Sequence, residues 1–436
     1  MVIKLSRILI DKLFNKMSVN NIDTNKKEGL VNDKGSKSDI INIVITDDRD
    51  KGKCVYDNAR KNKDTIIKKL DYPYLRYYIS GEEIRNNFNN LKKFSSSVVH
   101  EQYNLQSLPH IKDLKYDNKY YLIIDKPDEY KNIEVISDYF NEVCRVHCRF
   151  ISANESVYSF FRTKYNNIID YLQKNDLEIS IENMREAIWS NGPRECSTFK
   201  PKLIKFFIEL YSARKILDIS SGWGDRLVGV MASDIDEYDG FDPNPCLHKN
   251  YKEMIDFFKR DVVNKNAVYT IKELPFEEAE LKQNYYDLVM TSPPYFTMEI
   301  YDDNPKTNTK QSIVKMNNGG NGDDKANKGR CDGGKEGRSD GVGKGRCDGV
   351  GKGGRGHGDR ERVWYNDYLK VWINKCHNAL KKGGVIALNI NQYKNQHYIY
   401  WLLDDMKNSK WEYLGIISHS KPDKKNPQPT FIWRKL

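Results

Sequence analysis

Residues 215–227, Lys-Ile-Leu-Asp-Ile-Ser-Ser-Gly-Trp-Gly-Asp-Arg-Leu, contain the pattern that decides the predicted fold. The apolar residues around Asp218 predict a buried strand, a Gly-x-Gly turn follows it, and Leu227, Val228 and Met231 predict a helix after the turn. Glycine is needed where the backbone passes close to a ligand or takes a positive φ. Because a single Gly-x-Gly is also common in ordinary turns, its meaning depends on the residues that follow.

A second strand pattern, 238–241, ends at Asp242, eighteen residues after Gly224. An acid about 20 residues beyond a glycine loop is where a Rossmann-type fold binds ribose hydroxyls. Asp242 is also well placed to cap the helix that is expected after Pro243. The two roles are compatible with each other.

Residues 292–295, Ser-Pro-Pro-Tyr, follow a third strand pattern at 286–291. The serine can hydrogen-bond an exocyclic amine, and the prolines make a stiff turn whose carbonyls stay free to accept hydrogen bonds. The tyrosine ring offers a face on which an extruded base can stack. The candidate catalytic residues are therefore Ser292, Pro293, Pro294 and Tyr295, and the alternative is a Pro-Pro turn with no chemical role.

This ordered set resembles the class I S-adenosylmethionine-dependent amino-methyltransferases, in which Asp, Asn or Ser precedes Pro-Pro-Tyr or Pro-Pro-Phe. The resemblance covers roughly residues 190–436 and implies S-adenosyl-L-methionine as the cofactor. It also implies a set of cofactor-binding residues: the loop around the methionine part is matched by Asp218, Ser220, Gly222 and Gly224, and the ribose acid by Asp242.

Two parts of the match depart from the family's pattern or leave a choice open. Ser220-Ser221 stands where the family often has Pro-Phe or Gly, which affects the contacts to the methionyl carboxylate. An acid on the third strand approaches the adenine in the family, and either Glu273 or Glu277 could serve. Both could equally be surface acids.

Phe199 precedes a predicted helix that runs to Tyr211. It matches a Phe-x-Pro element that closes over the methionine end of the cofactor in the amino-methyltransferases. The alternative is an ordinary covering helix, with Thr198 as a nearby N-cap.

The remaining patterns complete a predicted α/β sheet. Helical patterns alternate with short apolar strands at 364–380, 385–390, 398–406, 411–418 and 430–433. Together with the resemblance, this predicts a doubly wound, mostly parallel, seven-stranded Rossmann-like methyltransferase sheet. Ligands bind such sheets at the carboxyl ends of the strands, where Gly222, Asp242 and Ser292 fall.

An insert interrupts this domain at 317–362. Sixteen of the chain's 28 glycines lie in it, and Gly-Arg-Cys-Asp or Gly-Arg-Ser-Asp recurs every eight residues from 329 to 348. Such a composition cannot build a core, so the insert is predicted to be disordered. Its Arg-Gly character could attract nucleic acid, but the interleaved acids favour an inert insertion.

The N-terminal part of the chain has two predicted sections. Residues 1–69 are predicted to be a disordered, low-complexity tail, in which 1–17 is basic and amphipathic enough to suggest an organelle presequence, although Asp11 argues against one. Residues 70–189 predict a smaller α+β region with a tyrosine-rich stretch at 72–78. Those aromatics could form a platform for bases, but packing in a core is the preferred interpretation.

Composition restricts the class of protein further. The chain has 436 residues, 39% of them hydrophobic, and a formal net charge of +10, which suits a polyanionic partner. Its eight cysteines show no zinc-like spacing, so we expect no metal, and Cys144 and Cys148 are interpreted as buried thiols in a reducing compartment. With no transmembrane-length apolar run, the expected location is intracellular, cytoplasmic or nuclear.

The sequence therefore predicts an enzyme that transfers a methyl group to an exocyclic amine of a nucleic-acid base. DNA is favoured over RNA as partner, and Ser292 slightly favours cytosine N4 over adenine N6. The alternatives are an RNA base or a protein glutamine as substrate, a catalytically silent nucleic-acid-binding subunit, and an interaction protein organised around its low-complexity segments.

Overall fold

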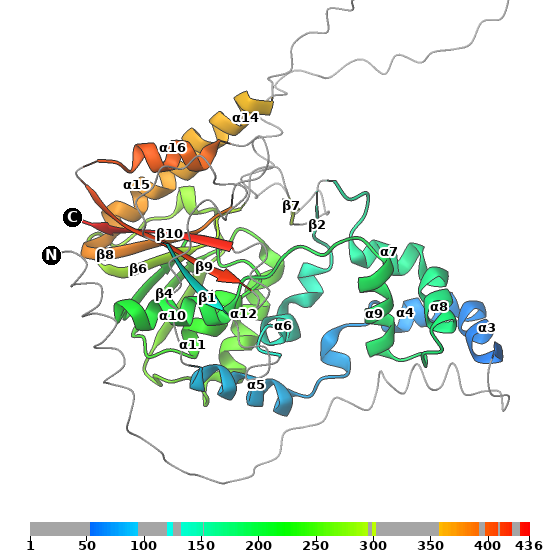
Figure 1. Cartoon of the computed structure of the whole chain (residues 1–436). Helices are drawn as coiled ribbons and strands as arrows, with labels where there is room; N and C mark the ends of the chain where they lie inside the picture. The colour runs from blue at the N-terminus through cyan, green and yellow to red at the C-terminus, as the bar shows by residue number, and fades with distance from the viewer. Residues whose placement is uncertain are drawn as a thin grey trace, which may run out of the picture.

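The computed structural model describes residues 53–94, 120–124, 132–150, 152–294, 299–301, 357–391, 397–408, 410–420 and 428–436. Eight strands form its main sheet, in the order β1-β9-β10-β8-β6-β3-β4-β5 (Figure 1). Seven of them come from the predicted methyltransferase region: β3 (Lys215–Asp218), β4 (Glu237–Phe241), β5 (Val268–Lys272), β6 (Tyr286–Thr291), β8 (Leu380–Asn389), β9 (Trp411–Ser420) and β10 (Gln428–Lys435).

The pairing of these seven strands confirms the predicted fold class. From β5 through β4, β3 and β6 to β8 every pair is parallel, whereas β10 runs antiparallel to both β8 and β9. The chain runs outward from β3 through β4 to β5 and then returns to β6 on the other side of β3, so the strand order reverses between β3 and β6. In an open α/β sheet a ligand binds outside the carboxyl ends of the strands at such a reversal.

Helices cover both faces of the sheet because its central strands are apolar on both sides. Ile216 belongs to the core under one face and its neighbour Leu217 to the core under the other, as expected when successive side chains alternate. The first face is covered by α10 (Pro201–Tyr211), α11 (Asp225–Met231) and α12 (Pro245–Phe258). The second is covered by α14 (His357–Trp364), α15 (Lys370–Ala379) and α16 (Tyr398–Asp405), with a π-helical turn at Tyr365–Leu369.

The N-terminal region is helical where the structure describes it. A separate hydrophobic cluster holds together α3 (Lys53–Lys61), α4 (Lys63–Leu70), α7 (Val157–Thr163), α8 (Tyr165–Lys174) and α9 (Ile181–Asn191), at the right of Figure 1. Helix α6 (Val135–Arg145) lies between this cluster and the sheet, whereas α5 (Gly81–Lys93) packs against α12 through Phe88 and Phe258. The short helix Leu75–Tyr77 connects α4 to α5 along the chain. The predicted tail 1–69 therefore needs correction: α3 and most of α4 fall inside it, and residues 1–52 lie outside the described part.

The strands of the N-terminal region pair with the downstream domain. The strand β1 (Tyr120–Ile124) extends the main sheet by pairing parallel to β9. The strand β2 (Arg149–Phe150) pairs antiparallel with β7 (Glu299–Ile300), just beyond the Ser-Pro-Pro-Tyr motif. In the described residues, the region predicted as α+β is thus mainly helical, and its two strands pair with strands of the methyltransferase region instead of forming a sheet of their own. In the tyrosine-rich stretch, Tyr72 and Tyr74 are buried, which supports the core interpretation over a base platform.

Helix α14 corrects the predicted end of the insert. It begins at His357, inside the range 317–362 that was expected to be disordered, and residues 317–356 lie outside the described part. Within α14, Glu361 is fully buried. Its carboxylate accepts hydrogen bonds from the backbone N–H groups of His397 and Tyr398, the latter at 2.9 Å. A charged residue from the apparent insert therefore anchors the start of α16.

Four cysteines are paired, contrary to the expectation of reduced thiols. Cys144 is bonded to Cys246, and Cys148 to Cys196. The partners are 102 and 48 residues apart, so sequence spacing gave no indication of the pairing. Among the described residues, Cys376 remains a free and buried thiol, and no cluster of three or more metal-ligating side chains is present. No described helix has the length and apolar character needed to span a membrane.

Candidate cofactor and active site

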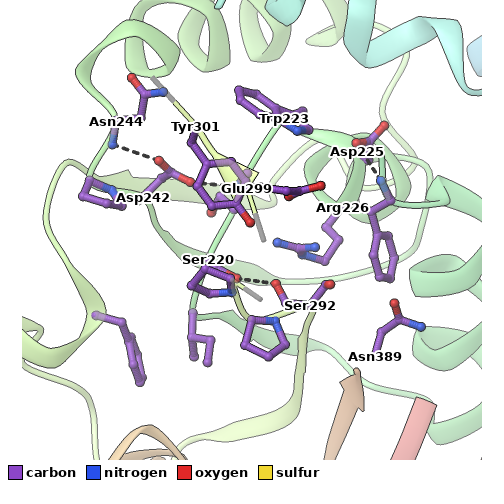
Figure 2. A pocket seen from close by; sticks show the side chains of 18 of the residues that line it. Ser220, Trp223, Asp225, Arg226, Asp242, Asn244, Ser292, Glu299, Tyr301 and Asn389 are labelled. Carbon is purple, nitrogen blue, oxygen red and sulfur yellow. Dashed lines mark hydrogen bonds between the residues drawn. The ribbon is translucent and has the colours of Figure 1, made fainter. Parts of the chain in front are cut away.

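One pocket at the carboxyl edge of the sheet collects most of the candidate residues, which follow β3, β4 and β6 (Figure 2). Of the predicted site, it is lined by Phe199, Ser220, Gly222, Asp242, Ser292, Pro293 and Pro294. Tyr295, the last predicted catalytic residue, lies outside the described residues, and its role stays a prediction. Elements from three separate strands thus meet at the position predicted by the strand order.

The glycine loop after β3 is held tightly against the end of β4. Ser221 N–H donates to the Phe241 carbonyl at 2.8 Å, and Gly222 N–H donates to the Asp242 carboxylate at 2.8 Å. Gly222 has φ of +58° and Gly224 has φ of +87°, which L side chains rarely adopt. The two glycines therefore serve the turn itself, and Gly222 also lines the pocket.

Asp218 has a supporting position, and its expected contact with the cofactor is revised. The residue is fully buried and does not line the pocket. Its carboxylate accepts hydrogen bonds from Arg226 Nε and the Tyr238 hydroxyl, both at 2.8 Å, and from Ser220 N–H at 3.2 Å. With these lone pairs occupied by the protein, Asp218 fixes the loop rather than facing the ligand space.

Asp242 faces the pocket from the end of β4. Its two carboxylate oxygens accept hydrogen bonds from Gly222 N–H at 2.8 Å and from Asn244 N–H at 2.9 Å. The cap of α12 is Asn244, whose side chain accepts from Cys246 N–H, so the structure gives the N-cap role to Asn244 and not to Asp242. Burial raises the pKa of Asp242 to about 7. A ligand group that donates a hydrogen bond to this carboxylate would stabilise its ionised form.

Ser220 links the glycine loop to the predicted catalytic motif. Its hydroxyl donates to the Ser292 carbonyl at 3.0 Å and lies 2.7 Å from the Thr291 hydroxyl. Because the single hydroxyl hydrogen of Ser220 goes to Ser292, Thr291 is the donor of the second bond. Ser220, the first of the two serines that depart from the family's Pro-Phe pattern, thus ties the glycine loop to the Ser-Pro-Pro turn.

Phe199 lines the pocket from the segment before α10. Its backbone N–H donates to the Asp225 carboxylate at 3.2 Å, and its ring lies 4.9 Å from the Arg226 guanidinium carbon. The N-cap of α10 is Lys200, with Pro201 in the first turn, so Thr198 does not cap this helix. Thr198 lines the pocket instead.

Several pocket residues were missed by the sequence patterns. Asp225 directly follows Gly224, and burial raises its pKa to about 7. Glu299, on β7, is also buried, and burial raises its pKa. Of the two acids considered for the third strand, Glu277 lines the pocket beside Phe276 and Glu273 does not. The remaining missed residues include Trp223, Asn389, Asn391 and Tyr301.

The charged lining of the pocket is mostly acidic. Among the described residues, four carboxyl groups line it, from Asp225, Asp242, Glu277 and Glu299, together with one guanidinium, from Arg226. That guanidinium is already ion-paired with Asp218 at 2.8 Å. The site is thus arranged to accept hydrogen-bond donors and positive charge.

Comparisons with known proteins give only distant likenesses. No known sequence family and no curated protein matches the chain. A protein assigned as a class I S-adenosylmethionine-dependent methyltransferase from Listeria monocytogenes is 12% identical, with 82% of this chain and 88% of that one covered and a TM-score of 0.34. The tRNA methyltransferase TrmI from Aquifex aeolicus is 12% identical, with 56% and 72% covered and a TM-score of 0.29. An S-adenosylmethionine-dependent O-methyltransferase from Thermotoga maritima is 12% identical, with 55% and 67% covered and a TM-score of 0.30.

These values are too low to transfer a function, a substrate or a residue role. The chemistry of the pocket therefore has to be interpreted from its own residues.

Proposed function

We propose that the protein is an S-adenosylmethionine-dependent methyltransferase that acts on an exocyclic amine of a nucleic-acid base, with DNA favoured over RNA. One observation carries the proposal: the glycine loop, Asp242 and the Ser292-Pro293-Pro294 turn line a single pocket at the carboxyl edge of the sheet. The hydrogen bond between Ser220 and the Ser292 carbonyl joins the two halves of that pocket. A cofactor held on the loop and an amine held on the turn would therefore be neighbours.

The charge of the pocket supports a cationic cofactor. S-adenosylmethionine carries a positive sulfonium, a positive ammonium and two ribose hydroxyls, and its sulfonium supplies the methyl group. The acidic lining of Asp225, Asp242, Glu277 and Glu299 complements the positive groups, because a bound cation would favour the ionised forms of Asp225 and Asp242, whose pKa values burial raises to about 7. Asp242 would accept the ribose hydroxyls, and Glu277, which also lines the pocket, is the candidate for adenine recognition.

The motif would act mainly by positioning. An exocyclic amine of cytosine or adenine is a poor nucleophile because its lone pair is delocalised into the ring. Hydrogen bonds from the amine to the Ser292 hydroxyl and the Pro293 carbonyl favour the tetrahedral nitrogen, whose lone pair points out of the ring plane. After transfer, the extra proton of the amine is released to solvent. Tyr295 would stack on the base.

The substrate end of the pocket has amide side chains that suit a base. Asn389 ends β8, and Asn391 follows it in the lining. Carboxamides pair well with the donor and acceptor edges of bases. A serine before Pro-Pro-Tyr leans toward cytosine N4 rather than adenine N6. The competing substrates are an RNA base and a protein glutamine, and the competing role is a silent binding subunit.

The experiment is to incubate the protein with methyl-labelled cofactor and separate pools of DNA, RNA and protein, and then to identify the labelled group. We expect label on a DNA base, with Ser292→Ala strongly reduced. Ser233→Ala is the control, because Ser233 is a buried serine whose hydroxyl donates to the Gly229 carbonyl and does not line the pocket. Label on RNA or protein would reassign the substrate, and cofactor binding without any transfer would favour the silent subunit.

A further inference from the structure

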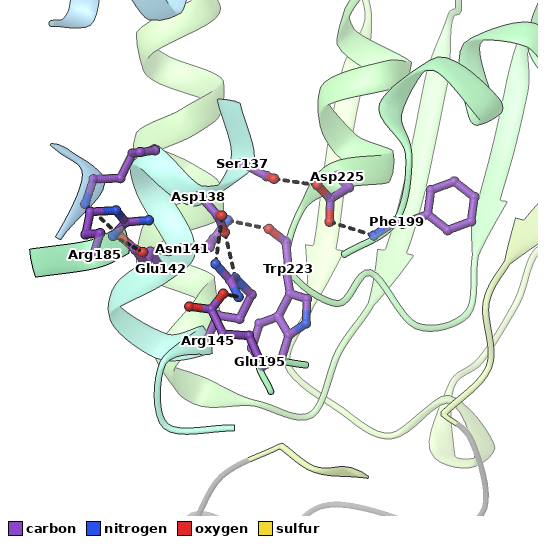
Figure 3. A network of polar contacts seen from close by, with 11 residues as sticks. Ser137, Asp138, Asn141, Glu142, Arg145, Arg185, Glu195, Phe199, Trp223 and Asp225 are labelled. Carbon is purple, nitrogen blue, oxygen red and sulfur yellow. Dashed lines mark hydrogen bonds and ion pairs between the residues drawn. The ribbon is translucent and has the colours of Figure 1, made fainter. Parts of the chain in front are cut away.

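Helix α6 reaches the glycine loop from outside the predicted methyltransferase domain. Ser137 and Asn141, one turn apart on the same face of α6, are both fully buried (Figure 3). The Ser137 hydroxyl donates to the Asp225 carboxylate, and Asn141 Nδ2 donates to the Trp223 carbonyl at 2.9 Å. Trp223 and Asp225 both line the pocket, so α6 contacts the wall of the proposed cofactor site from behind.

Asn141 packs closely against the glycine loop at Gly224. A Cβ placed on Gly224 would lie 2.8 Å from Asn141 Nδ2, closer than Cβ atoms approach other atoms, and 3.1 Å from Met254 Cε, which is a tight contact. The loop is therefore pressed between α6 and α12. On the other side, the Tyr251 hydroxyl of α12 donates to the Gly222 carbonyl. Asn141 thus provides one of the two side-chain donors that hold the carbonyls of Gly222 and Trp223.

Covalent and ionic contacts fix α6 in this position. The disulfide between Cys144 and Cys246 attaches α6 to the first turn of α12, four residues after Asp242. The disulfide between Cys148 and Cys196 attaches the residues that follow α6 to the segment before Ser197. The Arg145 guanidinium, almost fully buried, binds Asp138 within α6 at 2.7 Å and Glu195 at 2.6 Å. The helix is therefore joined to both segments that flank the pocket.

We propose that Asn141 is a positioning residue of the cofactor site, and that α6 of the N-terminal region completes that site by holding the Gly222-Trp223-Gly224 loop in its binding conformation. The proposal rests on the proposed function, since the ligand is taken to be S-adenosylmethionine. Its physical basis is that the Trp223 carbonyl would lose its donor if the Asn141 amide were removed. A buried carbonyl without a partner is unfavourable, so the loop would move to expose it.

The test compares Asn141→Leu with Asn87→Leu in the full chain. Leucine has nearly the shape of asparagine and removes the donor. Asn87 is the matched control because it is a buried asparagine on the neighbouring helix α5, its Nδ2 has no hydrogen-bond partner within the described part of the chain, and it does not line the pocket. We expect S-adenosylmethionine affinity, measured by calorimetry, to fall about tenfold or more in Asn141→Leu and to stay within about twofold in Asn87→Leu.

Two further readouts separate positioning from general stability. At saturating cofactor the turnover of Asn141→Leu should recover, so that KM changes and kcat does not. Backbone hydrogen exchange at 221–224 should be faster in Asn141→Leu than in the control, with or without ligand. If Asn141→Leu cannot be purified folded, Ser137→Ala, which removes the other α6 donor, is measured in the same way with the same expectations.

Unchanged cofactor affinity and unchanged exchange in the α6 variant would overturn the proposal, and so would equal losses in Asn87→Leu. If the wild-type protein fails to bind the cofactor while the α6 variant still speeds exchange at 221–224, the positioning role stands and the proposed function fails.

Discussion

Asp242→Asn provides the sharpest test of cofactor binding. The substitution keeps the shape of the side chain and one acceptor oxygen but removes the negative charge. Two ribose hydroxyls that donate to a carboxylate gain about 1.5–3 kcal/mol each, against about 0.5–1.5 kcal/mol for a neutral acceptor. The expected loss is therefore about 2 kcal/mol, or roughly 30-fold in the dissociation constant for S-adenosylmethionine measured by calorimetry.

The pH dependence of binding gives a second quantity for the same variant. The pKa of Asp242 is raised by burial from 3.8 to about 7 in the free protein, so the carboxyl is mostly protonated below pH 7. Ligand hydroxyls donate to the ionised form, so binding lowers this pKa and releases a proton. The wild-type affinity should therefore rise as pH increases from 6 to 8. Burial also raises the pKa of Asp225 to about 7, so Asp225 contributes to the pH dependence of both proteins. The contribution of Asp242 is therefore the difference in pH dependence of the cofactor affinity between the wild type and Asp242→Asn.

Stability should change in the opposite sense. A native pKa above the unfolded value means that the native state holds a proton that the unfolded state has lost, so wild-type stability falls as pH rises from about 4 to about 7. The shift from 3.8 to about 7 corresponds to a cost on the order of 4 kcal/mol at most. Asp242→Asn removes this cost but loses one backbone hydrogen bond. The difference in the free energy of unfolding between the variant and the wild type, measured by urea titration, should therefore shift in favour of the variant as pH rises.

The control for these measurements is Asp239→Asn. Asp239 lies on the same strand, is buried, and accepts a hydrogen bond from the Tyr286 hydroxyl, but it does not line the pocket. We expect its cofactor affinity to match the wild type. If Asp242→Asn binds the cofactor as the wild type does, with the same pH dependence, Asp242 serves only to hold the Gly222 and Asn244 amides, and the reasoning is refuted.

Three other predictions concern the catalytic turn, the disulfides and the insert. Ser292→Ala should slow turnover by about 10- to 100-fold in single-turnover assays with cofactor affinity unchanged, whereas Tyr295→Ala should also weaken substrate binding by about 1–3 kcal/mol and Tyr295→Phe should be mild. Equal damage from both Tyr295 variants together with full activity of Ser292→Ala would exclude a flipped base on this motif. Cys246→Ser should reduce the free energy of unfolding by about 2–5 kcal/mol in non-reducing denaturant titrations, since the bond joins residues 102 apart, and an equal stability of the two proteins would contradict the bond. Replacing residues 320–355 by a short Gly-Ser linker should shift Tm by only about 2 °C because loop length adds little closure entropy, and a large drop in calorimetric Tm would mean that the repeat packs against the protein.

The local patterns in the sequence predicted the parts of the site that depend on residues close together in the chain. A strand, a Gly-x-Gly turn, a helix and an acid at the end of the next strand are each encoded within about ten residues, and their order predicted the sheet. Gly222, Asp242 and Ser292 accordingly lie in one pocket. The same patterns predicted strands at 411–418 and 430–433, because short apolar runs bounded by polar residues are distinctive at any position, whereas the antiparallel pairing of β10 was found only in the structure.

The tertiary structure decided which side chains face the ligand. Asp218 fitted the pattern for a cofactor contact, but packing brings Arg226 and Tyr238 onto its carboxylate, so it supports the loop. Asp225 and Glu299 belonged to no pattern, and they line the pocket because α11 and β7 place them there. Whether a polar group meets a ligand or another side chain depends on residues far away in the chain, which periodicity and spacing do not describe.

The N-terminal region illustrates the same limit most clearly. Its sequence indicated only a folded unit of unknown role, yet α6 contacts the glycine loop through Asn141 over a separation of 82 residues and is bonded to Cys246 over 102. Contacts at such separations depend on which surfaces pack together when the whole chain folds. The sequence by itself therefore determined the sheet and the order of its motifs, and the packing of distant segments determined how those motifs are held together and what completes the site.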